Sequence, residues 1–231
     1  GQPYGVIRGD YALRDDEGNF LIAGNGGDTR QGEIINSSDV GLNDKVIGDP
    51  NPDWRLTTIN SISYKNFTFS AQLEYQHGGE IASSSVENML ERFVTRDNEN
   101  REGSFVQPGF LADSATGELF LDEDGNKIPN NLQLSGFRTV FSNYYNNDDL
   151  KMFDTDLFRI RELSIGYTYT PKEKDNLPFQ KLNIKLSGRN LWHKAPDFPK
   201  YINFDPATDR GLGRSTVPNT RRFSLGLTAN L

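Results

Sequence analysis

The sequence predicts an all-β chain with six long antiparallel strands in up-and-down order, near residues 2–13, 53–64, 67–77, 156–170, 180–192 and 219–231. Three observations favour this fold class. Apolar and polar residues alternate along most of these segments, as in a strand with one apolar and one polar face. A composition with 22 Gly, 15 Phe and 9 Tyr but 2 Met suits strands and turns better than helices. The connections between the segments alternate between long and short.

Composition also limits the function. The net charge of -7 argues against nucleic acid and anionic lipid as partners. With 2 His and no Cys, the chain cannot form disulfides, a catalytic thiolate or a cysteine-based zinc site. We expect no enzyme activity, no catalytic residue, no metal and no other cofactor. No apolar run reaches the roughly 20 residues of a membrane-spanning helix. Because the chain begins at Gly1 without Met, we expect a piece of a longer protein.

The first predicted strand has its apolar side chains among glycines, at Tyr4, Val6, Ile7 and Tyr11. Acidic residues followed by Gly18 and Asn19 then predict a turn. A short return arm is expected at residues 20–23. From residue 24 to residue 53 the sequence is rich in Gly, Asn, Asp and Ser, so we expect a loop.

Residues 54–77 show the clearest pattern, two arms of 11 residues joined by Lys65 and Asn66. The apolar face of the second arm carries Phe67, Phe69, Ala71, Leu73 and Tyr75. Its polar face includes Gln72, Glu74 and Gln76. The first arm alternates in the same way except at Ile59, which falls on the polar face. Because Asn tolerates the positive φ of a two-residue turn, we expect Asn66 to supply it.

The segment from residue 78 to about residue 155 is the longest insertion. An apolar stripe with helical spacing predicts a helix over residues 83–95, with Ser84 and Glu87 as its capping box. We expect this stripe to pack on the base of the loop rather than bind a ligand. Residues 122–126 space their acids as in a calcium loop, but their Gly stands fourth instead of sixth. A hairpin turn is therefore the favoured interpretation.

Three more segments alternate toward the C-terminus. Their apolar faces carry Leu163, Ile165 and Tyr167, then Leu182, Ile184 and Leu186, and finally Phe223, Leu225 and Leu227. The opposite faces carry Lys185, Ser224 and Thr228. Phe158 and Ile160 are out of phase with the residues that follow them. This mismatch suggests either a β-bulge near Arg161 or aromatic packing in the loop above.

The strand lengths suit a membrane. An arm of 11 residues tilted by about 45° crosses roughly 25 Å, the height of the apolar band of an outer-membrane barrel. Aromatic residues at both ends of the hairpin, such as Trp54 and Tyr64, suit the two membrane interfaces. Such barrels have short turns on the periplasmic side and long loops outside. We therefore predict a segment of a transmembrane antiparallel β-barrel, with residues 78–155 and 193–218 on the outer side.

In a barrel wall the apolar face contacts lipid and the polar face lines the interior. The predicted lipid-facing residues are Phe67, Phe69, Leu73, Leu182, Ile184, Leu186, Phe223, Leu225 and Leu227. The predicted interior-facing residues are Gln72, Glu74, Gln76, Lys185, Ser224 and Thr228. In the outer loops, the aromatic candidates for contact with a ligand or a lid protein are Tyr144, Tyr145, Phe198 and Tyr201.

Five short runs together resemble the C-terminal end of a SusC/RagA-like TonB-dependent outer-membrane receptor. They are Ile-Gly-Asp-Pro-Asn-Pro at 47–52, Arg-Glu-Leu-Ser-Ile-Gly-Tyr at 161–167, Ser-Gly-Arg-Asn-Leu at 187–191, Phe-Asp-Pro at 204–206 and Phe-Ser-Leu-Gly-Leu at 223–227. The runs follow the family's order over about residues 1–231. In two respects the chain departs from the family: the plug domain and TonB box are absent from these residues, and the chain ends in Leu231 where many such barrels end in an aromatic residue.

The resemblance implies that residues 1–231 are the C-terminal part of a barrel of about 22 strands, closed by a plug domain. It implies import of glycan or peptide nutrients with energy from the TonB complex. A SusD-like surface lipoprotein acting as a lid, and the outer membrane of a Gram-negative bacterium of the Bacteroidota type, are implied as well.

The residues leave two other functions open. One is a soluble carbohydrate-binding β-sandwich, in which Trp54, Trp192, Tyr144 and Tyr145 would stack on sugar. Such a sandwich accommodates strands of the same length. The other is a passive outer-membrane porin without a plug or a lid.

Overall fold

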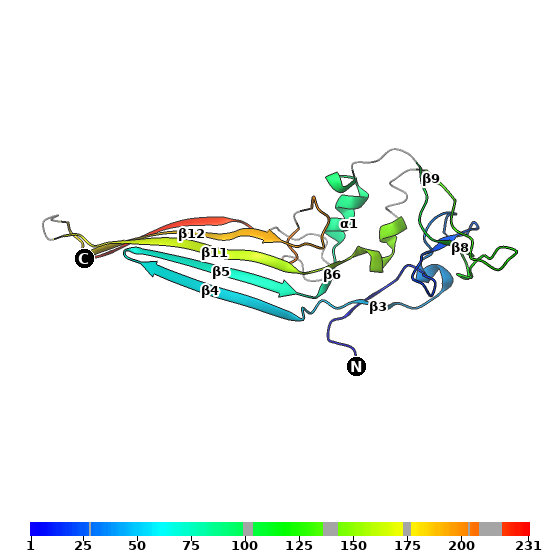
Figure 1. The fold of residues 1–231 in the computed structure, drawn as a ribbon, viewed down its shortest axis with the longest axis horizontal. Coiled ribbons are helices and arrows are strands. Elements are labelled where there is room, and N and C mark those ends of the chain that lie inside the picture. Colours follow the sequence, from blue (N-terminus) through cyan, green and yellow to red (C-terminus); the bar gives the residue numbers. More distant parts are fainter. Residues whose placement is uncertain (28, 99–103, 136–142, 173–176, 203, 208–218) are drawn as a thin grey trace.

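A computed structural model describes residues 1–231 except 28, 99–103, 136–142, 173–176, 203 and 208–218. The chain has a long β-sheet with a more compact part at one end (Figure 1). We call this compact part the loop module. It comprises the described residues of 1–53, 78–156 and 195–221.

The described residues form one large sheet of five antiparallel strands in the order β13-β12-β11-β5-β4. These strands are β4 (Trp54–Tyr64), β5 (Phe67–His77), β11 (Leu157–Tyr169), β12 (Lys181–Lys194) and β13 (Arg222–Asn230). Each long strand pairs with the next long strand of the chain, which confirms the predicted up-and-down order. Their bounds lie close to those predicted from the alternation.

The long connections leave the sheet at one end. The register pairs Trp54 with His77 and Phe158 with Lys194, so these strand ends lie beside the loop module. The two short connections lie at the opposite end (Figure 1). For the residues described, this confirms that 78–155 and 193–218 leave the sheet on the same side; residues 208–218 lie outside the described part.

A β-bulge at Arg161 changes the phase of β11. Leu163 pairs with Ala71 of β5, whereas Ile160 pairs with Leu73, so β11 contains one extra residue between these pairs. The extra residue returns Ile160 to the face that carries Leu163. Of the two explanations for the phase mismatch, the bulge is therefore confirmed.

The turn between β4 and β5 differs from expectation. Lys65, not Asn66, takes the positive φ, at 53°. The carbonyl oxygen of Asn66 instead accepts a hydrogen bond from the backbone N–H of Thr168 on β11, at 2.8 Å. This bond holds Asn66 against the neighbouring strand, so the expectation for Asn66 was wrong.

Residues 2–13 do not form a long strand, and this predicted strand was wrong. They contain the short β1 (Ile7–Gly9), which pairs with β3 (Lys45–Gly48) outside the large sheet. Farther along, Ala12 and Leu13 are both buried although they are neighbours. A wall strand turns successive side chains to opposite faces, so a segment buried on both sides belongs in a core.

The loop module brings distant segments together. β2 (Leu21–Ala23) pairs in parallel with β8 (Phe110–Ala112). The other short strand pairs are β6 (Glu80–Ala82) with β10 (Met152–Asp154), and β7 (Ser104–Phe105) with β9 (Leu134–Ser135). The 3-10 helices are η1 (Ser37–Val40), η2 (Arg96–Asn98) and η3 (Asp148–Lys151). Residues 1–53 and 78–155, expected as separate loops, therefore build one module.

Apolar side chains of the module form buried clusters. The cluster nearest the sheet contains Ile81, Val86, Leu90, Tyr145, Phe198 and Ile202. Two further clusters among the described residues lie around β2; they contain Leu13, Leu21, Ala23, Ile35 and Ala112, and Ala12, Ile22 and Ile34. The module therefore has a hydrophobic core of its own.

The helix α1 (Ser84–Glu91) is shorter than predicted. Its N-cap is Ser83, whose hydroxyl oxygen accepts a hydrogen bond from the backbone N–H of Val86, so Ser84 is not the cap. Phe93 takes a left-handed φ of 56°, which ends the helix before residues 93–95. Val86 and Leu90 are buried in the cluster near the sheet, as the predicted packing requires. None of the helices in the described residues is long and apolar enough to cross a membrane.

Two turns of the module share one construction. Asp122 Oδ1 accepts hydrogen bonds from the backbone N–H groups of Asp124 and Asn126, at 3.0 and 2.8 Å. Asp15 Oδ1 accepts the same pair of bonds from Glu17 and Asn19, at 3.0 and 2.8 Å. The predicted hairpin turn at residues 122–126 is thereby confirmed.

Candidate functional site

The two faces of the large sheet differ in chemistry over all five described strands. Leu225 of β13 pairs with Leu186 of β12, which pairs with Ile165 of β11, which pairs with Phe69 of β5. Residues paired across a sheet lie on the same face, so these side chains form one continuous apolar face. The intervening residues form the polar face.

Aromatic rings gather at both ends of the apolar face. At the end beside the loop module, Trp54 lies 5.1 Å from Tyr75 and Phe158 lies 5.8 Å from Trp192, measured between ring centroids. At the opposite end, the Phe67 and Tyr167 centroids lie 4.9 Å apart. Two aromatic belts at the ends of an apolar face are typical of a membrane wall.

The polar face carries a charged network near the loop module. Arg161 Nε donates a hydrogen bond to Glu74, and Arg55 Nε lies 3.8 Å from the same carboxylate. Beside it, Arg189 Nε donates to Glu162 Oε2 at 3.0 Å, while Lys185 Nζ lies 3.9 Å from the other oxygen. The bulge at Arg161 makes this possible, because it turns Arg161 and Glu162 to the same face.

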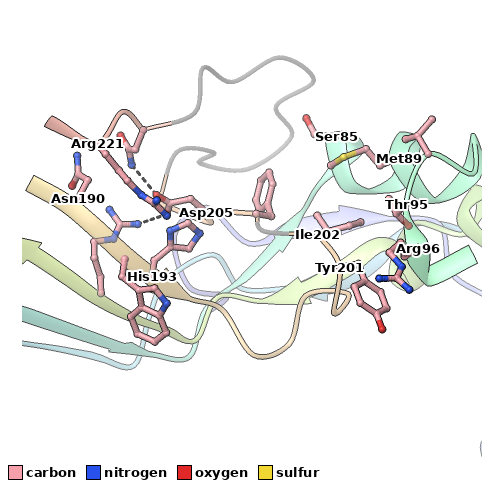
Figure 2. Close-up of a pocket in the computed structure, with 15 residues that line it drawn as sticks. Ser85, Met89, Thr95, Arg96, Asn190, His193, Tyr201, Ile202, Asp205 and Arg221 are labelled. Atoms are coloured by element: carbon pink, nitrogen blue, oxygen red, sulfur yellow. Dashed lines mark hydrogen bonds and ion pairs between the residues drawn. The ribbon is translucent and has the colours of Figure 1, made fainter.

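Above this network lies a pocket of about 650 Å³, which we call the outer pocket (Figure 2). It lies between α1, the loop after β12 and the loop-module ends of β11 and β12. Its described lining residues come from 85–96, 190–193, 201–205, 219 and 221, together with Arg159.

Arg159 and Asp205 fix one wall of the outer pocket. Arg159 is 2% exposed and forms an ion pair with Asp205. Asp205 also accepts hydrogen bonds from the backbone N–H of Ala207 at 3.1 Å and from Asn219 Nδ2 at 2.9 Å (Figure 2). These bonds tie both ends of the connection between β12 and β13 to the polar face.

Several buried polar atoms of the outer pocket have no hydrogen-bond partner within the described part of the chain. They are Thr95 Oγ1, Arg159 Nε and His193 Nε2. His193 was expected at the surface, but its register with Arg159 places it on the polar face under the loop. The lining also holds Arg96 and Arg221.

Asp156 fixes the start of the longest insertion. Its carboxylate accepts hydrogen bonds from Gly78 N–H at 2.7 Å and interacts with His77 Nδ1 at 3.0 Å. Burial raises the pKa of Asp156, but these two partners outweigh it and hold the pKa below its usual value. The residue therefore stays ionised and closes the base of the loop.

Comparison with known proteins points in the same direction as the geometry. No protein-family model matches the chain. The chain is similar to a TonB-dependent receptor of Formosa agariphila, at 23% identity over 197 residues. The match covers 79% of this chain and 17% of the receptor, so the chain corresponds to a small part of that protein. This distant similarity supports a fragment of a TonB-dependent receptor, and with it an outer-membrane location.

All nine residues predicted to face lipid lie on the apolar face. The register aligns them as Phe67 and Phe69 with Tyr167 and Ile165, Leu73 with Ile160, and Leu182, Ile184 and Leu186 with Ala229, Leu227 and Leu225, with Phe223 opposite Gly188. The residues predicted to face the interior, Gln72, Glu74, Gln76, Lys185, Ser224 and Thr228, lie on the polar face. What each face contacts in the whole protein is a matter for the proposal below.

The aromatic loop candidates occupy different environments. Tyr145 and Phe198 are buried in the cluster near the sheet, and Tyr144 packs against it. Burial raises the pKa of Tyr145 to about 12. These three side chains therefore stabilise the module in this structure. Tyr201 is exposed and lines the outer pocket.

The sequence reasoning missed the polar residues of the outer pocket. Arg159 stands between Phe158 and Ile160 in a strand, and a charged residue flanked by apolar ones was a usable signal. Asp205 lay in a run already noted for its resemblance to the family. Their pairing across 46 residues had no signal in the pattern.

Proposed function

We propose that this chain forms part of the β-barrel wall of a SusC/RagA-like TonB-dependent receptor. The receptor imports glycan or peptide nutrients across the outer membrane of a Gram-negative bacterium of the Bacteroidota type. A SusD-like lipoprotein closes over the outer loops as a lid, and the TonB complex acts on another part of the receptor. The proposal assigns this chain no catalytic chemistry.

One observation carries the proposal, namely the uncovered apolar face of the large sheet. Phe223, Leu225 and Leu227 are 72%, 67% and 65% exposed. In the described part of the chain, the other sheets have two strands each and belong to the loop module. Large apolar side chains in such a row need another apolar environment. Lipid supplies it in a barrel wall.

The alternatives fit this observation less well. A carbohydrate-binding sandwich would pack its apolar face on a second sheet about 10 Å away. Its expected sugar platform is also split, because Trp54 and Trp192 lie on the apolar face while Tyr144 packs in the module. A passive porin would have the same two faces. The similarity to a TonB-dependent receptor favours an active importer over a porin.

Cysteine labelling tests the proposal. Single replacements Phe223→Cys, Leu225→Cys and Leu227→Cys are made in the full-length receptor, in a background free of other cysteines. We expect each to react with a membrane-permeant, lipid-soluble thiol reagent and to resist a charged, water-soluble one. Ser224→Cys and Thr228→Cys serve as matched controls on the same strand, and we expect them to react with the water-soluble reagent when it can enter the barrel.

The outcomes are distinct. If the three apolar positions resist both reagents in folded receptor, they face a protein core, and the wall assignment fails. If they react mainly with the water-soluble reagent, the face is solvated and the assignment fails as well. A receptor that is absent from the outer-membrane fraction would also refute the proposed function.

A further inference from the structure

We infer that the outer pocket binds a carboxylate group of the imported ligand. This inference rests on the proposed function and adds the chemical class of the substrate. The pocket lies on the polar face, at the end of the sheet where the long loops are, and so at the entrance of the proposed barrel (Figures 1 and 2).

The unpartnered buried atoms are the first step of the argument. Arg159 Nε is a permanent donor, and Thr95 Oγ1 can donate through its hydroxyl. His193 Nε2 donates in one tautomer and in the protonated ring. Buried polar atoms without a partner are rare and destabilising, and a ligand is one of the accepted explanations. An oxygen-rich, acceptor-only group suits such a set of donors.

Charge is the second step. The chain carries a net charge of -7, yet the described lining of the outer pocket has three arginines, Arg96, Arg159 and Arg221, against one carboxylate, Asp205. Asp205 is already engaged by Arg159, Ala207 and Asn219. The remaining positive charge favours a negatively charged group. Arginine is well suited to planar carboxylates.

Size and rigidity are the third step. A volume of about 650 Å³ lies within the usual range of small-molecule sites. Met89, Ile202 and Phe204 supply an apolar wall. Ile202 belongs to the buried cluster near the sheet, and Met89 and Phe204 pack against it. The polar groups are therefore held by packed elements rather than by free side chains.

Two nutrient classes carry the required group. An acidic oligosaccharide has carboxylates on its sugar rings, and a peptide has one at its C-terminus. The shared chemistry is the carboxylate, and matched pairs of probes separate the two sources.

The experiment measures binding to the purified full-length receptor in detergent by isothermal titration calorimetry. The probes are trigalacturonate with its methyl ester, and trialanine with its C-terminal amide. Each pair differs by one charged group against its neutral derivative. We expect the acid of one pair to bind at least about tenfold more tightly than its neutral partner, because hydrogen bonds to a charged group are the stronger ones.

Two variants locate the effect. Thr95→Val keeps the side-chain shape and removes the hydroxyl, and we expect about a tenfold loss for the acid with little change for its neutral partner. Thr228→Val, at the opposite end of the sheet, should leave both affinities unchanged. Arg221→Gln should weaken the acid about two- to fivefold, as for an exposed charge. The adjacent Arg222→Gln makes the same charge change outside the pocket lining and should have less than half that effect.

Each result decides the inference. A preference for trigalacturonate assigns the saccharide source, and one for trialanine assigns the peptide source. Equal affinity of acid and neutral probes, no binding of any probe, or equal losses in Arg221→Gln and Arg222→Gln would overturn the inference. The cysteine labelling is independent of these results, so a receptor with lipid-facing 223, 225 and 227 but no acid preference retains the proposed function and loses only the carboxylate site.

Discussion

The large sheet and the loop module place apolar side chains in opposite environments. In β13 of the sheet, Leu225 is two-thirds exposed at 67%. In the module, Ile22 is completely buried and packs with Ala12 and Ile34. The module therefore contains the partners of its own apolar residues, whereas the sheet depends on surroundings outside the chain. The comparison suggests that the module can keep its structure when the wall is damaged, and the reverse.

The two parts also differ in the range of their pairings. Strands of the sheet pair with the next long strand, so each strand needs one apolar and one polar face. In the module, β2 pairs with β8, which brings Leu21 beside Phe110. Such long-range pairs need no regular alternation, because the short strands are covered on both sides.

The largest expected effect comes from opening the module core. Ile22→Ala should destabilise the module by about 2–5 kcal/mol, because it leaves a cavity in a packed cluster. Hydrogen exchange of β2 and β8 in the full-length receptor should rise accordingly, with the large sheet unchanged. Ile59→Ala is the matched control, since Ile59 is 76% exposed, and its cost should be within about 0.5 kcal/mol. Equal costs for both would contradict a separate core in the module.

A second effect of similar size concerns the wall. Leu225→Arg places a charge on the proposed lipid face and should cost roughly 2–4 kcal/mol near mid-depth. Receptor in the outer-membrane fraction should fall, while any receptor that assembles should keep normal exchange in β2 and β8. Ser224→Arg, one residue away on the polar face, should assemble like the unmodified protein. If both arginine variants assemble equally well, the lipid contact of this face is wrong.

The sequence predicted the sheet well for a physical reason. A strand that separates two environments must alternate, and the alternation of Leu225 with Ser224 can be read from neighbouring residues. Even the bulge was predictable, because Ile160 and Leu163 fall out of phase by one residue.

The module could not be predicted in the same way. Ala12 and Leu13 are buried side by side, so their segment carries no period that distinguishes a core strand from a loop. The pairing of Arg159 with Asp205 depends on tertiary structure and has no local pattern. Local rules also erred by one residue at the helix start, where Ser83 and Ser84 are equally good caps and packing decides between them.

The helix cap allows a finer test within the module. Ser83→Ala removes the acceptor of the Val86 N–H and should destabilise α1 by about 0.5–2 kcal/mol. Ser84→Ala, at the first helical position, makes the same chemical change without removing the N-cap and should have a smaller effect. The measurement is hydrogen exchange of peptides spanning α1. A larger effect of Ser84→Ala would restore the capping box expected from the sequence.

The smallest effect concerns the contact between the two turns of the module. Lys127 Nζ lies 2.7 Å from Asp15 Oδ2, and this bond holds the pKa of Asp15 well below its usual value. Asp15 in turn raises the pKa of Lys127. The contribution of Asp15 is therefore complete above the unfolded Asp pKa of about 3.9 and is lost as pH falls through the lower folded value. That of Lys127 is complete below the unfolded Lys pKa of about 10.4 and is lost as pH rises through the higher folded value.

Asp122 provides the internal reference for this pair. Its pKa is also lowered, chiefly by the backbone N–H of Asn126, and the same kind of turn surrounds it. Lys127→Met should remove the largest cause of the Asp15 shift and leave the turn bonds to Glu17 and Asn19 in place. Hydrogen exchange of residues 15–19, corrected for intrinsic rates, should then begin to rise at a higher pH than in the unmodified protein. Exchange at residues 122–126 should begin to rise at nearly the same pH in both proteins. An unchanged pH profile at 15–19 would show that the turn alone, without the lysine, sets the ionisation of Asp15.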